Sequence, residues 1–116
     1  MTVILKTRQV GDVTIVDAEG SITLGQDAVH FGDTIRGLAA NGHKKILLNL
    51  AGISYMDSSG IGEMVSGFTA VANQGGVLKL VKLSERVHGV LVLTGLHTVF
   101  EVHADEAQAA ASFGAE

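Results

Sequence analysis

The sequence contains no cysteine, which excludes disulfides, thiolate metal sites and a cysteine nucleophile. This absence is compatible with a reducing compartment, and we expect a cytoplasmic protein. Proline is also absent, so glycine must mark the turns. The longest apolar runs, such as residues 90–93, are far shorter than the ~20 residues that span a bilayer. The first residues do not read as a signal peptide, and we expect no membrane insertion.

Positive charge is sparse and scattered along the chain. Eight Lys and Arg residues stand against twelve Asp and Glu residues, giving a formal net charge of −4, and Lys44-Lys45 is the one adjacent basic pair. We therefore expect no direct nucleic-acid partner, because such partners need a clustered basic face. The chain has 116 residues, of which 47% are apolar and 17% charged, and this predicts one packed domain spanning residues 1–116.

Hydrophobic periodicity predicts the element order ββαβαβαβα. Residues 2–9 and 13–19 flank a Gly-Asp turn and are typical of a hairpin, and a short extended piece follows at 21–23. The later predicted strands are 45–50, 77–82 and 98–102, with a loop at 51–56. The predicted helices cover about 28–41, 61–74, 84–94 and 105–112. This order predicts an α/β fold with a mixed, mostly parallel sheet, an N-terminal hairpin and about four helices.

The segment that suggests chemistry joins the strand at 45–50 to the following helix. Partners of α/β folds bind at the loops that follow the carboxyl ends of parallel strands. Asp57, Ser58 and Ser59 lie at the start of that helix, where free N–H groups and partial positive charge would tolerate a phosphate. Asp and Ser are also the favoured N-cap residues, so the same three residues could serve only to start the helix.

Two glycines in the first turn of this helix argue against a purely capping role. Gly60 and Gly62 each cost about 0.5–1 kcal/mol of helix stability relative to alanine. Such glycines make sense where another backbone approaches closely or where the turn is tight. Two consecutive serines are likewise redundant for capping.

Two stretches carry a resemblance to a known family: Ile46-Leu47-Leu48-Asn49-Leu50 and Tyr55-Met56-Asp57-Ser58-Ser59-Gly60-Ile61-Gly62. Together they resemble the signature of bacterial anti-sigma factor antagonists, which are STAS domains. The likeness continues through most of the chain, at Gly20, at the Gly75-Gly76 pair and in the helix that begins at Ser84. The loop after Gly20 departs from the family, because residues 21–24 carry no acidic side chain.

The resemblance implies a cycle with two partners. The unphosphorylated antagonist binds an anti-sigma factor that has serine kinase activity, and a sigma factor is freed. Phosphorylation of Ser58, with Ser59 as the less favoured acceptor, switches this binding off, and a PP2C-type phosphatase reverses it. The resemblance implies no enzyme activity, catalytic residue, metal, cofactor or small-molecule substrate. The expected partner-binding residues are Asp57, Ser58, Ser59, Gly60, Ile61, Gly62, Tyr55 and Thr23. Glu63 and Ser66 are further candidates, whereas Met64 and Phe68 are expected in the core.

Other functions fit the sequence less well. Residues 57–62 do not match the Gly-x-Ser-x-Gly elbow of hydrolases, and the phosphate-binding glycine loops are missing. The five histidines lack the spacing of paired metal ligands: His30, His43, His88, His97 and His103. The remaining alternative is a non-phosphorylated STAS adaptor in a stressosome-like scaffold or a lipid-transport complex. A serine after Asp57 favours the switch.

Overall fold

The computed structural model describes residues 2–114 and contains a five-stranded sheet in the order β1-β2-β3-β4-β5. Its strands are β1 (Ile4–Val10), β2 (Val13–Ile22), β3 (Lys45–Met56), β4 (Val77–Val81) and β5 (Val102–His103). The β1–β2 pair is antiparallel and the other pairs are parallel. The helices are α1 (Gln26–Ala40), α2 (Ser58–Asn73), α3 (Glu85–Leu93) and α4 (Glu106–Ala111), and a short 3₁₀ helix covers Leu96–Thr98. The predicted α/β class and element order are confirmed.

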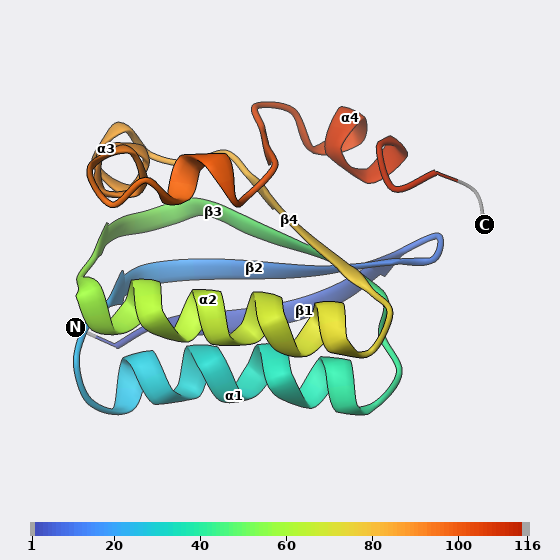
Figure 1. Ribbon diagram of the computed structural model, residues 1–116, viewed down its shortest axis with the longest axis horizontal. Helices are drawn as coiled ribbons and strands as arrows, with labels where there is room; N and C mark the ends of the chain where they lie inside the picture. The colour runs from blue at the N-terminus through green and yellow to red at the C-terminus, as the bar shows by residue number, and fades with distance from the viewer. Residues whose placement is uncertain (1, 115–116) are drawn as a thin grey trace.

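The helices divide unequally between the two faces of the sheet. We call the face covered by α1, α2 and α3 the front face, and the larger hydrophobic core lies there. Figure 1 shows α1 and α2 side by side along the strands. The apolar stripe of α1 is buried in this core as its spacing predicts, with Phe31 and Ile35 fully inaccessible to solvent. We call the opposite face the back face, and α4 covers a smaller core there.

The segment 51–56, predicted as a loop, is instead the second half of β3. It pairs with the end of β2, from Gly52 opposite Glu19 to Met56 opposite Ile22, so the expected extended piece at 21–23 is largely the end of β2. Register shifts interrupt this pairing between Asp17 and Glu19 and again after Gly20. The shifts break the regular alternation of apolar and polar residues by which a strand is recognised. The extension carries the chain to the start of α2.

The last strand lies later than predicted and is shorter. Residues 96–98 form the 3₁₀ helix, and β5 pairs with β4 over just two positions. Phe100, which the prediction placed inside the strand, is 3% exposed and packs edge-on against Phe68 with ring centroids 5.1 Å apart. The aromatic side chain of Phe100 thus belongs to the core on the front face.

Candidate functional site

Asp57 organises the turn between β3 and α2. Its backbone is extended, with φ −89° and ψ −174°, and it is the N-cap of α2. Its Oδ1 atom accepts hydrogen bonds from the backbone N–H groups of Ser59 and Gly60, at 2.9 and 3.0 Å. Its Oδ2 atom accepts a third, at 2.9 Å, from Leu24 in the loop between β2 and α1. One carboxylate therefore starts the helix and ties the neighbouring loop to it.

These backbone donors also fix the charge of the cap. The N–H groups of Gly60, Leu24 and Ser59 hold the pKa of Asp57 below its usual value, because they stabilise the ionised carboxylate. The N-terminus of α2 contributes partial positive charge in the same place. Asp57 is therefore ionised at neutral pH, and the cap carries a negative charge beside Ser58.

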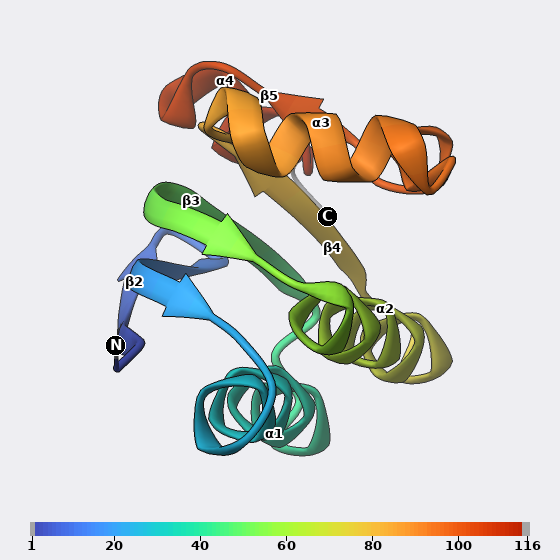
Figure 2. The same cartoon turned by 90° about the vertical axis from the view of Figure 1, so that its left-hand side faces the viewer.

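Ser58 and Ser59 differ in their access to solvent. Ser58 is the first residue of α2 and is exposed, whereas Ser59 is half-buried. The capping acceptor is the carboxylate of Asp57, so the helix needs neither serine hydroxyl to begin. The Ser58 hydroxyl stands at the surface, at the carboxyl edge of the parallel strands. Figure 2 looks onto this edge.

The two glycines of the first turn have different surroundings. Gly60 is buried, and a Cβ atom there would lie 2.6 Å from Met56 Cγ and 2.7 Å from the carbonyl oxygen of Ile22. The expected close approach of another backbone is confirmed at this position. Gly62 is exposed, and a Cβ atom there would meet nothing within 4 Å. Packing within the described residues gives no reason for glycine at position 62.

Several predicted site residues are buried or half-buried beneath the surface that surrounds Ser58. Ile61 is 6% exposed and its side chain lies in the front core beside the buried Gly60. Thr23 is half-buried, and its carbonyl accepts a hydrogen bond of 3.2 Å from Ala28 at the start of α1. These residues shape the site and offer little side-chain surface to a partner. Met64 is fully buried as predicted, and Phe68 packs against the same core.

The exposed rim of the site contains apolar side chains. Tyr55 is 39% exposed, and the guanidinium carbon of Arg86 lies 5.2 Å from the centre of its ring. Leu24 is 81% exposed and is held beside Ser58 by the bond from its N–H group to Asp57. The sequence interpretation missed Leu24. Leu24 could have been identified as an apolar residue beside Gly25, in the loop after Gly20 that departs from the family.

Glu63 and Ser66 are joined to α1 by one arginine. Arg36 donates from Nη1 to Glu63 Oε1 at 2.8 Å and to Ser66 Oγ at 3.0 Å, and from Nη2 to Asp33 at 2.7 Å. Glu63 is half-buried and Ser66 is exposed. This network fixes α2 against α1 and thereby the direction of the site surface.

Residues 2–114 contain neither a metal-binding cluster nor a membrane-spanning helix. No group of three or more His, Asp or Glu side chains in this range lies together as a metal site requires. The helices of the same range include none that is long and apolar enough to cross a bilayer.

The family of the chain follows from comparison with known proteins. The family model of the STAS domain matches residues 5–109. The chain therefore belongs to the STAS domain family.

Particular relatives agree with this family. The anti-sigma-B factor antagonist of Bacillus subtilis (strain 168) is 46% identical over 55 residues, which are 47% of this chain and 50% of the relative. The chain spans about half the length of the curated relatives it matches. Among solved structures, unphosphorylated SpoIIAA, an anti-sigma factor antagonist, superposes with a TM-score of 0.80 at 21% identity, covering 94% of this chain and 95% of that one. A Thermotoga maritima protein with a proposed role as an anti-sigma factor antagonist has a TM-score of 0.87 at 24% identity, covering 94% and 93%.

Proposed function

We propose that this chain is an anti-sigma factor antagonist in which phosphorylation of Ser58 switches partner binding off. Its partners in this proposal are an anti-sigma factor with serine kinase activity and a PP2C-type phosphatase. The observation that carries the proposal is the exposed Ser58 hydroxyl, which α2 does not need because Asp57 supplies the cap. The Bacillus subtilis relative is named for the antagonist function, and the structural neighbour SpoIIAA from Bacillus has been solved in a phosphorylated form.

The surface around Ser58 is suited to close contact with another protein. Ser58, Gly62 and Ser66 are exposed and follow one another at intervals of four residues, so they lie on one face of α2. Small side chains along this face let a partner's backbone come near the helix. Leu24 and Tyr55 add exposed apolar surface at the rim. Such surface contributes to affinity when a partner excludes water from it.

The charge of a phosphate provides the switch. Phosphorylation adds about −1.5 to −2 charges at neutral pH. The N–H groups of Ser59 and Gly60 already donate to Asp57, whose own negative charge opposes a second anion in the same place. A phosphate on Ser58 therefore stays on the surface, where a docked partner would have to desolvate it. A hundredfold loss of affinity needs about 2.7 kcal/mol, so no change of fold is required.

The proposal is tested by affinity capture from a lysate of the source organism, read by quantitative mass spectrometry. The four baits are wild type, Ser58→Asp, Ser58→Asn and Asn41→Asp. Ser58→Asn has the shape of Ser58→Asp without its charge. Asn41→Asp adds one charge far from Ser58 in the chain, at the exposed C-cap of α1. We expect an ATP-binding serine kinase on every bait except Ser58→Asp, and we expect that kinase to phosphorylate Ser58. Equal recovery of scaffold or transporter proteins by all four baits would instead make the chain an adaptor.

A further inference from the structure

The C-terminal segment is attached to the back face of the sheet, remote in sequence from the Ser58 turn. We call residues 106–114, which comprise α4 and the three residues after it, the C-terminal latch. Ala109 is the one fully buried residue of α4, and Phe113 is half-buried. Figure 2 shows α4 on the side of the sheet away from α1 and α2.

The latch covers an apolar strip on the back face. Each of three strands contributes one or two residues to this strip. Val13 and Ile15 of β2, Leu47 of β3 and Val81 of β4 are each at most 3% exposed. Above them the latch places two alanines and the ring of Phe113. An alanine side chain buries little apolar area. The hydrophobic free energy that holds the latch closed is therefore small, although the strip beneath it consists of apolar side chains.

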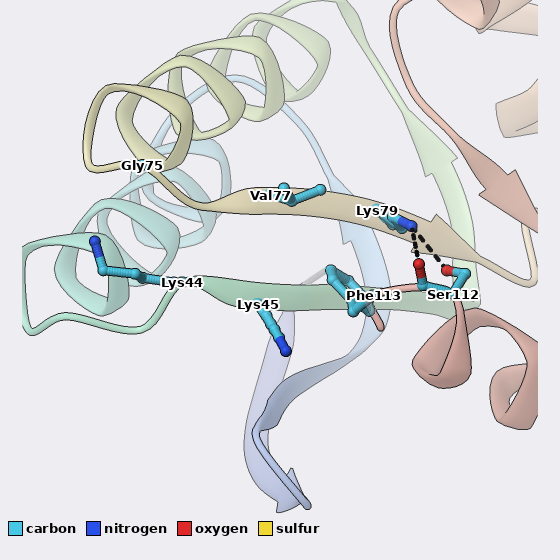
Figure 3. Close-up of a pocket in the computed structure, with 7 residues that line it drawn as sticks. All are labelled: Lys44, Lys45, Gly75, Val77, Lys79, Ser112 and Phe113. Atoms are coloured by element: carbon cyan, nitrogen blue, oxygen red, sulfur yellow. Dashed lines mark hydrogen bonds between the residues drawn. The ribbon is translucent and has the colours of Figure 1, made fainter. Parts of the chain in front are cut away.

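Three basic side chains of the sheet supply the remaining attachment. Lys45 of β3 donates to the Gly114 carbonyl oxygen at 2.9 Å. Arg8 of β1 donates to both carboxylate oxygens of Glu106, at 2.5 and 3.1 Å. Lys79 of β4 donates to the Ser112 carbonyl at 3.0 Å and to its hydroxyl at 2.8 Å, and its ammonium lies 4.7 Å from the centre of the Phe113 ring. Figure 3 shows Ser112 and Phe113 beside strands β3 and β4, with both Lys79 bonds dashed.

One side of the latch borders an open hollow. The hollow has a volume of about 370 Å³, and its walls include Val77, Lys79, Ser112 and Phe113. Val77 is 49% exposed, so water reaches the latch from this side. The Arg8–Glu106 pair, whose side chains are 41% and 28% exposed, is also partly screened by solvent. Both features make this end of the chain easier to open than the front core.

We propose that residues 106–114 open and close as one unit, held shut by Arg8, Lys45 and Lys79, while the sheet and the front helices stay folded. Opening uncovers the strip formed by Val13, Ile15, Leu47 and Val81. The apolar strip on the back face is therefore exposed only when the latch is open. High salt or the loss of one basic side chain favours the open form. This inference does not depend on the function proposed for Ser58.

Hydrogen exchange read by mass spectrometry tests the latch in the purified full chain. We compare wild type, Arg8→Gln and Lys79→Met at about 0.05 M and about 1 M salt, a range over which the screening length falls severalfold to roughly 3 Å. The matched control is Arg36→Gln, which removes an arginine of similar exposure from the front helices. In wild type, amides of the latch should be protected but should exchange faster than those of β2 and β3. Arg8→Gln or high salt should accelerate the latch about fivefold and leave β2 and β3 unchanged.

Several results would overturn the proposal. Exchange of the latch at the slow rate of β2 and β3 would mean that it opens only when the whole chain unfolds. Unprotected latch amides in wild type would mean that the closed arrangement is not populated. An equal effect of Arg8→Gln and Arg36→Gln on the latch would show that the bond to Glu106 is not what holds it.

Discussion

Alanine at the two glycines of the first turn of α2 should change stability in opposite directions. Gly62→Ala adds a methyl group to open space and removes the helix penalty of glycine, so it should stabilise the fold by about 0.5–1 kcal/mol. Gly60→Ala places a Cβ atom 2.6 Å from Met56 Cγ and 2.7 Å from the Ile22 carbonyl oxygen. Relieving such overlap typically costs about 1–3 kcal/mol.

Thermal unfolding measures this difference directly. For a chain of this size, 1 kcal/mol corresponds to roughly 4 °C in Tm. Gly62→Ala should therefore raise Tm by a few degrees, and Gly60→Ala should lower it. Shifts of the same sign for both variants would refute the argument, because they would mean that the close approach at Gly60 is absent or that Gly62 is also crowded.

The same variants separate stability from binding. If a partner's backbone comes close to Gly62, Gly62→Ala should weaken capture of the kinase although the protein is more stable. Gly37→Ala in α1 is the matched control, because a Cβ atom there also meets nothing within 4 Å. It should stabilise the fold to a similar extent and leave binding unchanged. Wild-type binding by Gly62→Ala would show that the partner does not approach that helix face.

Three further outcomes follow from the same geometry. Asp57→Ala removes the acceptor of three backbone N–H groups and should lower the unfolding free energy in urea by about 1–2 kcal/mol, so an unchanged urea midpoint would contradict its capping role. Because the folded-state pKa values of Asp57, Asp17 and Glu101 lie below their usual values, their contribution to stability is complete above about pH 5 and is lost as the pH falls further. Asp57→Asn, which retains a capping side chain, should lose less stability on acidification than wild type, and an identical acid profile would count against this assignment. Gly20→Ala, at φ +110° with a Cβ atom 2.6 Å from the Thr2 carbonyl oxygen, should destabilise the fold by more than about 1 kcal/mol, which an unshifted melting curve would contradict.

Local sequence signals predicted much of the fold. The apolar stripe with Phe31 and Ile35 located α1, and the apolar run at 45–50 located the first half of β3. The glycine between residues 9 and 13 located the hairpin. These signals are strong because side-chain burial repeats with the period of the element that carries it.

The second half of β3 escaped prediction because its pairing is irregular. Ile53 and Met56 are both buried, although they are three positions apart, and this spacing contradicts a simple strand pattern. The register shifts of the β2–β3 pair account for that spacing. A bulge is a property of two strands together, so one strand's sequence cannot reveal it.

The site was predicted in part for a similar reason. Asp57 and the two serines could be identified from capping chemistry and from the family resemblance. The hydrogen bond from the Leu24 N–H group to Asp57 could not be identified in this way, since it joins residues 33 positions apart in the chain. The Arg8–Glu106 pair on the back face spans 98 positions. Such contacts are fixed by the topology of the sheet and leave no local pattern.

The most direct test of the central claim compares two purified proteins that differ by one phosphate. Phosphoserine is incorporated at position 58 during synthesis, and the affinity of the captured kinase for the modified and unmodified chains is measured by calorimetry. We predict binding at least about a hundredfold weaker for the phosphorylated chain, with an unchanged fold. Affinities that agree within about threefold would contradict the account, because Ser58 would then be an exposed residue of the α2 N-terminus and not a switch.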